Sequence, residues 1–225
     1  MPTDRTRLLR ILHLASPALP IGAFHFSQGL EYAVEAGWVT DEPTALDWIG
    51  GVATQSIGTL DLPVLIRLYR AHRAGDSETR RRWGHFLMAA RETRELRAED
   101  RHMGSALARV LQQLEIDGPP LDAQGEQPGY AEIFAIACVH WSITEAEAAQ
   151  AYAWTWAENQ TLAAVKLVPL GQSAGQRILH SLVPLLEQLA TRAPDIADED
   201  IGACVIRQGL ASVWHESQYT RLFKS

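Results

Sequence analysis

The stretch TEAEAAQAYAWTWAENQTLAAVK, residues 144–166, indicates the fold class of this 225-residue chain. Its apolar residues recur at spacings of three and four, which is the periodicity of an α-helix. Thr144 and Glu147 form the capping box typical of a helix N-terminus. We therefore predict one long helix over residues 145–166.

The same periodicity continues in both directions along the chain. Further helices are predicted over residues 8–14, 27–36, 46–53, 60–73, 78–92, 95–114, 130–141, 172–191 and 198–213. Gly37, Gly75 and Gly118 stand where helices are expected to stop. Alternation of the strand type is nearly absent, so we predict an all-α fold: a single-domain helical bundle of about nine or ten helices.

One long irregular piece interrupts this pattern. Residues 115–129, EIDGPPLDAQGEQPG, have the glycines and adjacent prolines of a surface loop between two helical halves. We expect one domain over residues 1–225, followed at its end by a C-terminal tail, residues 214–225, that docks a partner.

Composition excludes several classes of protein. A net charge of -7 argues against a nucleic-acid-binding protein, which needs a basic face. Cys138 and Cys204 are too few for a disulfide scaffold and are typical of a cytoplasmic protein. The arginines and apolar run of the first twenty residues resemble a signal peptide faintly, but charged residues interrupt the run. No apolar stretch approaches the ~20 residues that span a bilayer, so no membrane partner is expected.

The charged residues divide unevenly along the chain. Residues 67–109 hold eleven of the 20 basic residues, all of them Arg, whereas residues 110–206 hold three basic and thirteen acidic residues. Such a division fits either a docking patch or two solvated helical faces of opposite sign.

The motif GQSAG, residues 171–175, matches the G-x-S-x-G nucleophile elbow of serine hydrolases. An elbow requires a strand before the serine and a parallel sheet around it, and the chain is predicted to be helical. Aspartates and then His215 follow Ser173 in the order of an α/β-hydrolase, so a hydrolase stays an alternative. In the other interpretation, Gly171 and Gly175 lie on one helix face and allow a close helix crossing.

The eight histidines suggest a metal site, but no two of them are three or four residues apart. Cys138 and His140 are two apart, which on a helix separates their side chains by ~200°. We expect no metal site within a monomer and no cofactor. An exposed His shared across a dimer axis stays open.

Two other stretches favour interaction surfaces. Residues 16–31, SPALPIGAFHFSQGLE, place Phe24 and Phe26 in a loop stiffened by prolines, where they either contact a partner or fill the core. In HESQYTRLFKS, residues 215–225, the side chains of Tyr219, Leu222 and Phe223 either fold back on the domain or are buried by another protein.

These stretches resemble the UreF family of urease accessory proteins, over nearly the whole chain. The shared residues are Ser16-Pro17, Leu19-Pro20-Ile21-Gly22, Phe24, Ser27, Gly29-Leu30-Glu31, Thr93-Arg94-Glu95, Lys166-Leu167-Val168-Pro169-Leu170-Gly171-Gln172, Gly175-Gln176, Gln218-Tyr219 and Arg221-Leu222-Phe223. The chain departs from the family pattern at Ala23 and at His25-Phe26.

The resemblance implies a non-catalytic, all-helical protein that dimerises and joins a UreD/UreH-type accessory protein. That pair would recruit the UreG-type GTPase to apo-urease, and the chain would couple GTP hydrolysis to nickel insertion. The partner-binding residues expected are Phe24, Lys166, Tyr219, Arg221, Leu222 and Phe223. Lys166 either makes a charged contact with the GTPase or extends its ammonium to water from a buried helix end. A helical scaffold unrelated to this family is the third alternative.

Overall fold

The computed structural model describes residues 4–116, 128–202 and 205–225. Within these ranges the regular structure is entirely helical, so the all-α prediction is confirmed. The α-helices are α1 (Asp4–Leu14), α2 (Leu30–Glu35), α3 (Glu42–Val52), α4 (Leu62–Ala74), α5 (Ser77–Ala90), α6 (Arg94–Gln113), α7 (Tyr130–His140), α8 (Glu145–Leu167), α9 (Gln172–Arg192) and α10 (Ile206–His215). The predicted loop 115–129 lies mostly outside the described residues.

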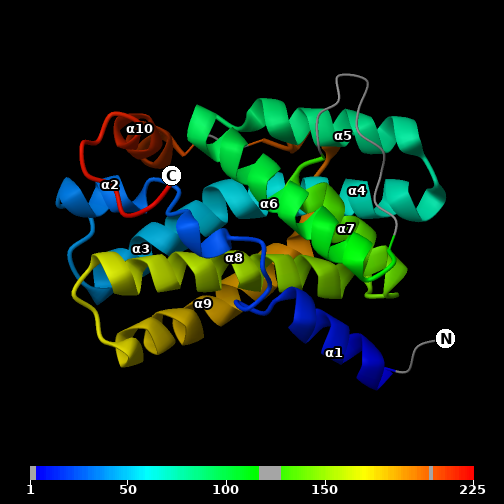
Figure 1. Cartoon of the computed structure of the whole chain (residues 1–225), viewed down its shortest axis with the longest axis horizontal. Coiled ribbons are helices and arrows are strands. Elements are labelled where there is room, and N and C mark those ends of the chain that lie inside the picture. The colour runs from blue at the N-terminus through cyan, green and yellow to red at the C-terminus, as the bar shows by residue number, and fades with distance from the viewer. Residues whose placement is uncertain (1–3, 117–127, 203–204) are drawn as a thin grey trace.

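The helices form a bundle around α7 and α8 (Figure 1). α7 packs against α4 and α6, and its residues from Ala131 to Cys138 are buried. α8 lies along α9 and also contacts α3 and α4. The short helix α2 packs against α10 at one end of the bundle, where the C-terminus lies, while α1 projects at the opposite end (Figure 1).

Helices α3 and α4 belong to one continuous helical run, because a π-helix, Ala53–Asp61, joins them. The sequence predicted two separate helices here. Pro63 stands at the start of α4, where its ring and missing N–H are incompatible with regular α-helical bonding, and a wider π turn accommodates it. The wide turn also places the Asp61 side chain in the interior, where it is 1% exposed.

The combined run, Glu42–Ala74, is the one helix in the described ranges that is long and apolar enough to cross a membrane. About two thirds of its most apolar window, 67%, is buried inside the domain. This burial is typical of the central helix of a folded core, which passes the same test of length and composition.

Most helix boundaries follow the sequence signals. The side chain of Thr144 accepts from the Glu147 backbone N–H and the Glu147 carboxylate accepts from the Thr144 N–H, so the capping box of α8 is confirmed. Gly75 ends α4 in the left-handed conformation. The predicted helix 198–213 is wrong in its first half, because Asp198–Asp200 form a 3₁₀ turn and α10 begins only at Ile206.

The glycines of GQSAG have different environments. A Cβ at Gly175 would lie 2.8 Å from Cγ2 of Val165, so α8 and α9 do cross closely at this residue. Gly171 precedes α9 as its N-cap, and no atom lies within 4 Å of a Cβ built there. The helix-crossing interpretation is therefore right for Gly175 and wrong for Gly171.

Candidate functional site

The C-terminal tail lies against its own domain, beside α2 and the loop that precedes it (Figure 1). The backbone N–H groups of Leu222 and Phe223 donate to the two carboxylate oxygens of Glu31, at 2.6 and 2.9 Å. The Lys224 N–H donates to the carbonyl of His25 at 2.7 Å, and the Ser27 N–H donates to the carbonyl of Ser225 at 2.7 Å. The tail is thus fixed along its backbone.

The structure brings three of the predicted partner-binding residues into contact. The Lys166 ammonium, at the end of α8, lies 5.7 Å from the ring centroid of Phe24 and 5.6 Å from that of Phe223. Both distances are within cation–π range. The loop 16–31, the end of α8 and the tail therefore meet at one place.

The tail residues divide between the interior and the surface. Phe223 is 5% exposed and belongs to the core, whereas Leu222 is 67% exposed and Tyr219 is fully exposed. Arg221 donates to the Glu95 carboxylate at 2.9 Å. In the loop, Phe26 is buried and Phe24 is 47% exposed. Each of the two stretches fills the core with one aromatic ring and leaves other apolar side chains at the surface.

Sequence reasoning missed a further apolar surface next to the tail. Helix α10 exposes four apolar side chains at helical spacing on its outer side: Ile206, Leu210, Val213 and Trp214. The predicted helix 198–213 contained the signal, since residues at i, i+4, i+7 and i+8 share one face. Together with Tyr219 and Leu222, these side chains make up what we call the C-terminal apolar surface.

The end of α10 contacts a buried group of ionisable side chains. His215, at the end of α10, is fully buried, with Nδ1 2.8 Å from a Glu95 carboxylate oxygen and Nε2 3.1 Å from a Glu31 carboxylate oxygen. Glu31 and Glu95 are themselves almost fully buried. We call these three residues the buried clasp.

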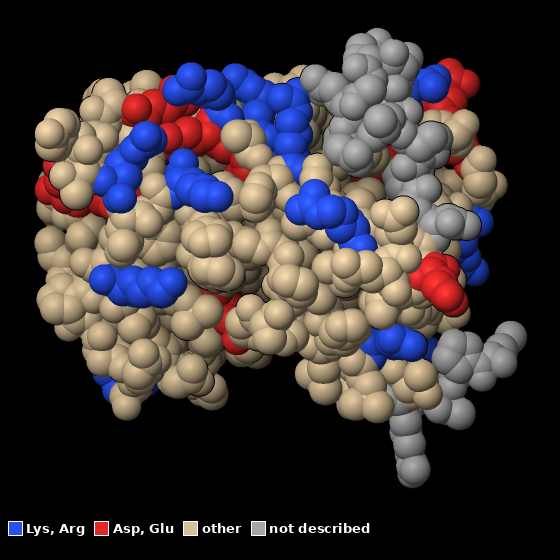
Figure 2. Space-filling model, in the orientation of Figure 1, with Lys and Arg blue, Asp and Glu red and all other residues tan. Residues whose placement is uncertain are grey.

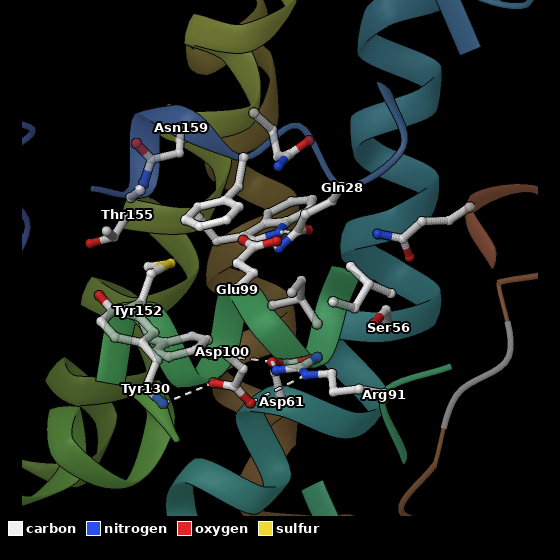
Figure 3. Close-up of a pocket in the computed structure, with 18 residues that line it drawn as sticks. Gln28, Ser56, Asp61, Arg91, Glu99, Asp100, Tyr130, Tyr152, Thr155 and Asn159 are labelled. Carbon is white, nitrogen blue, oxygen red and sulfur yellow. Dashed lines mark hydrogen bonds and ion pairs between the residues drawn. The ribbon is translucent and has the colours of Figure 1, made fainter. Parts of the chain in front are cut away.

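A cavity of about 60 Å³ opens between the π-helix Ala53–Asp61, α6, α7 and α8 (Figure 3). On its floor the Arg91 guanidinium binds both carboxylate oxygens of Asp61, at 2.6 and 3.1 Å, and lies 3.4 Å from Asp100. Tyr152 donates to Asp61 at 3.2 Å. Burial disfavours the guanidinium cation, but the charges of Asp61 and Asp100 outweigh this and raise the pKa of Arg91 well above its usual range.

The rest of the cavity wall combines polar and apolar side chains. The Tyr130 hydroxyl is buried there, and no described residue forms a hydrogen bond with it. A water molecule needs ~10–15 Å³ of such a cavity, so there is room for about four to six of them. Ordered water is the simplest partner for the hydroxyl.

Glu99 connects this cavity to the tail. Its carboxylate accepts from Gln28 at 2.8 Å and from the Ser225 hydroxyl at 3.1 Å, and the Trp156 indole N–H donates to Gln28 at 2.8 Å. Gln28 has a φ of 53°, which non-glycine residues rarely adopt, and these two bonds hold it there. Burial raises the pKa of Glu99 to about 7.

Comparison with known proteins identifies the family. A family model described as UreF matches residues 39–183. The urease accessory protein UreF of Hahella chejuensis is 44% identical over 219 residues, which cover 97% of this chain and 98% of the relative. That of Pseudomonas entomophila is 43% identical over 225 residues, which cover 100% of each chain. The chain belongs to the UreF family.

The structure of this UreF-family chain contradicts the hydrolase alternative. Ser173 lies exposed in the first turn of α9, and no strand precedes it among the residues described. His215, the histidine that a triad would need, has both ring nitrogens bonded within the buried clasp. Asp198 pairs instead with Arg67, at 3.0 Å. The GQSAG match is a helix start and not an elbow.

The uneven charge distribution is partly balanced within the UreF-family domain. Arginines of the basic segment pair with carboxylates of the acidic one: Arg67 with Asp198, Arg70 with Glu145, and Arg80 with Glu132. Figure 2 shows basic and acidic side chains intermixed along the upper part of the visible face. The described residues contain no group of three or more His, Cys, Asp or Glu arranged to hold a metal ion.

Proposed function

We propose that this UreF-family chain is an adaptor in urease maturation. In this role it joins a UreD/UreH-type accessory protein and the UreG-type GTPase to apo-urease, and it couples GTP hydrolysis to nickel insertion. The family supports a role beside urease, since its relatives are named urease accessory proteins. The assignment of partners is our inference.

The C-terminal apolar surface carries the proposal. Helix α10 and the segment that follows it expose Trp, Tyr and Leu side chains, with an arginine beside them in the sequence, and this is the composition of a protein–protein interface centre. The Leu222 backbone N–H is bonded to Glu31, so binding does not have to order this residue. We propose that the UreD/UreH-type protein covers this surface, with Arg221 at its rim.

Mixing the two purified proteins and following the complex by size-exclusion chromatography and calorimetry tests this assignment. The double variant Tyr219→Ala, Leu222→Ala is expected to weaken the complex at least tenfold, because each buried side chain contributes about 1.5 kcal/mol or more. Val183→Ala is the matched control, since Val183 is also exposed but lies on α9. Equal affinities of the double variant and the control would refute the assignment.

Lys166 and Phe24 are proposed to contact the GTPase. An adaptor couples nucleotide hydrolysis to metal delivery only if it binds the two nucleotide states with different affinity. Lys166 is exposed at the end of α8, where the rings of Phe24 and Phe223 hold its ammonium. We expect Lys166→Ala to reduce the ratio of the affinities for the GTP-bound and GDP-bound partner. An unchanged ratio contradicts this role. We also propose that the chain acts as a homodimer.

A further inference from the structure

Two histidine side chains approach each other at the surface, between the loop 16–31 and α6. His25 ends the 3₁₀ turn Ala23–His25 of this loop, and His102 lies in α6. A Cβ built at Gly22 would lie 3.0 Å from Nε2 of His102 and 3.5 Å from Nδ1 of His25. One nitrogen of each imidazole therefore lies beside the same small space.

The backbone at Gly22 keeps this space open. Gly22 has a φ of 74°, a conformation that favours glycine, and it has no side chain that would fill the space between the two rings. The His25 N–H donates to the Gly22 carbonyl at 3.1 Å, so a hydrogen bond closes the turn that carries His25. The turn itself thus fixes the backbone of His25 next to the space.

Each imidazole packs against an aromatic ring of the same loop. The ring centroids of His25 and Phe24 are 4.0 Å apart, and those of His102 and Phe26 are 5.5 Å apart. Both histidines are exposed, and among the described residues no group forms a hydrogen bond with either ring. In contrast to the ring nitrogens of His215, theirs are available to bind a ligand.

The surroundings of His102 favour the neutral form of its imidazole, which is the form that binds metal ions. Partial desolvation and the positive charges of Lys224 and Arg109 lower the pKa of His102, so its ring keeps a lone pair at neutral pH. The same two cations oppose a bound metal ion. Both are exposed, however, so water and salt screen their charges.

We propose that His25 and His102 form a two-imidazole site for a divalent transition-metal ion such as Ni²⁺ or Zn²⁺. Imidazole nitrogen is a preferred ligand of these ions, whereas Mg²⁺ and Ca²⁺ prefer oxygen. Water completes the coordination, and with two protein ligands the site binds in the micromolar range, more weakly than a structural site with four.

This site departs from the expectation of no metal site within a monomer. That expectation considered only pairs of histidines within one helix, and the two imidazoles come from different segments of the chain. His25 is also a position at which the chain departs from the family pattern. The proposal concerns the isolated chain and does not rest on the proposed function.

Titration of the full-length chain with Ni²⁺, followed by calorimetry and by proton NMR of the imidazoles, tests the site. Ni²⁺ is paramagnetic, so a bound ion should broaden the ring signals of His25 and His102. His25→Ala and His102→Ala are each expected to weaken binding at least about tenfold, since even a residue that only orients a metal ligand contributes this much. His180→Ala is the matched control, because His180 is also exposed but lies on α9.

Equal affinities of the three variants would overturn the proposal, and so would the absence of binding at millimolar Ni²⁺. Zn²⁺ should compete with Ni²⁺, whereas Mg²⁺ should not. Binding should also weaken as the pH falls to about 5, because protons displace the metal ion from imidazole, and an affinity independent of pH would contradict imidazole ligands. No partner protein takes part in these measurements, so their outcome is separate from that of the proposed adaptor role.

Discussion

The buried carboxyl group of Glu99 predicts an unusual dependence of stability on pH. Burial raises its pKa in the folded protein to about 7, compared with an ordinary value of 4.5. Between these two values the folded chain keeps the proton and the unfolded chain releases it. Stability is therefore highest below pH 4.5 with respect to this group, and it falls as the pH rises towards 7. At 1.36 kcal/mol per pH unit, the interval between the two pKa values corresponds to a loss of about 3 kcal/mol at most in the free energy of unfolding.

Glu99→Gln isolates this contribution, because a glutamine has the same size and does not titrate. Its amide keeps one acceptor for Gln28 or Ser225. We expect the free energy of unfolding of the variant, relative to that of the unaltered chain, to rise by about 3 kcal/mol between pH 4.5 and pH 7 and to level off above.

Urea unfolding followed by circular dichroism at half-unit steps from pH 4.5 to 8.5 measures this difference. Taking the difference between two chains cancels the titration of all other groups, including Glu132, whose pKa burial also raises. Glu35→Gln, with an exposed carboxyl group, should give a flat difference. If the difference for Glu99→Gln is flat as well, the Glu99 carboxyl group is not desolvated, which would contradict its burial in the structure.

Four further predictions concern the helix crossing, the tail, the serine and nickel. Gly175→Leu should destabilise the chain by about 1–3 kcal/mol in thermal unfolding, because its Cβ would lie 2.8 Å from Val165, whereas Gly171→Ala should change little; equal effects would contradict the crossing at Gly175. Deleting residues 216–225 should both abolish the complex with the UreD/UreH-type protein and lower the melting temperature of the isolated chain, since Phe223 and Ser225 are buried; an unchanged melting temperature would show that the tail does not pack on the domain. Ser173→Ala should leave urease activation intact, and an esterase activity that disappears with this change would contradict the assignment. Calorimetry should detect no submicromolar nickel binding by the monomer, and binding of that strength by separated monomers would mean that a site has been missed.

The sequence predicts the helices well because their signals are local. The capping box at Thr144 and the stop at Gly75 involve residues within one or two turns, and both are found in the structure. The junction of α3 and α4 was missed because residues 54–59, TQSIGT, are mostly polar or glycine and interrupt the apolar helical spacing. Here the π turn before Pro63 keeps the run continuous. The Asp61 carboxylate in this turn accepts hydrogen bonds from Arg91 and Tyr152, and these stabilise it.

The buried clasp could not be predicted, because nothing local distinguishes its members. Glu31 and Glu95 stand in first turns, where acidic residues are common, and His215 stands in a last turn, where basic residues are common. Their burial depends on α10 folding back onto α2 and α6. Pairs separated by more than a hundred residues leave no pattern in a single sequence.

The sequence allowed two interpretations of the tail: that it folds back on its own domain, or that another protein buries it. The structure shows why these are not exclusive. Leu222 and Phe223 are neighbours, yet one side chain is exposed and the other is buried. The exposed fractions follow this alternation: Leu222 is exposed, Phe223 buried, Lys224 exposed and Ser225 buried. The dipeptide therefore anchors the tail to its domain through one side chain and presents the other outward. A partner that also buried Phe223 would have to break the two amide bonds to Glu31 and withdraw the ring from Lys166. A partner that uses Leu222 and Tyr219 leaves these contacts in place, so we expect it to bind the tail in the conformation that the isolated chain already has.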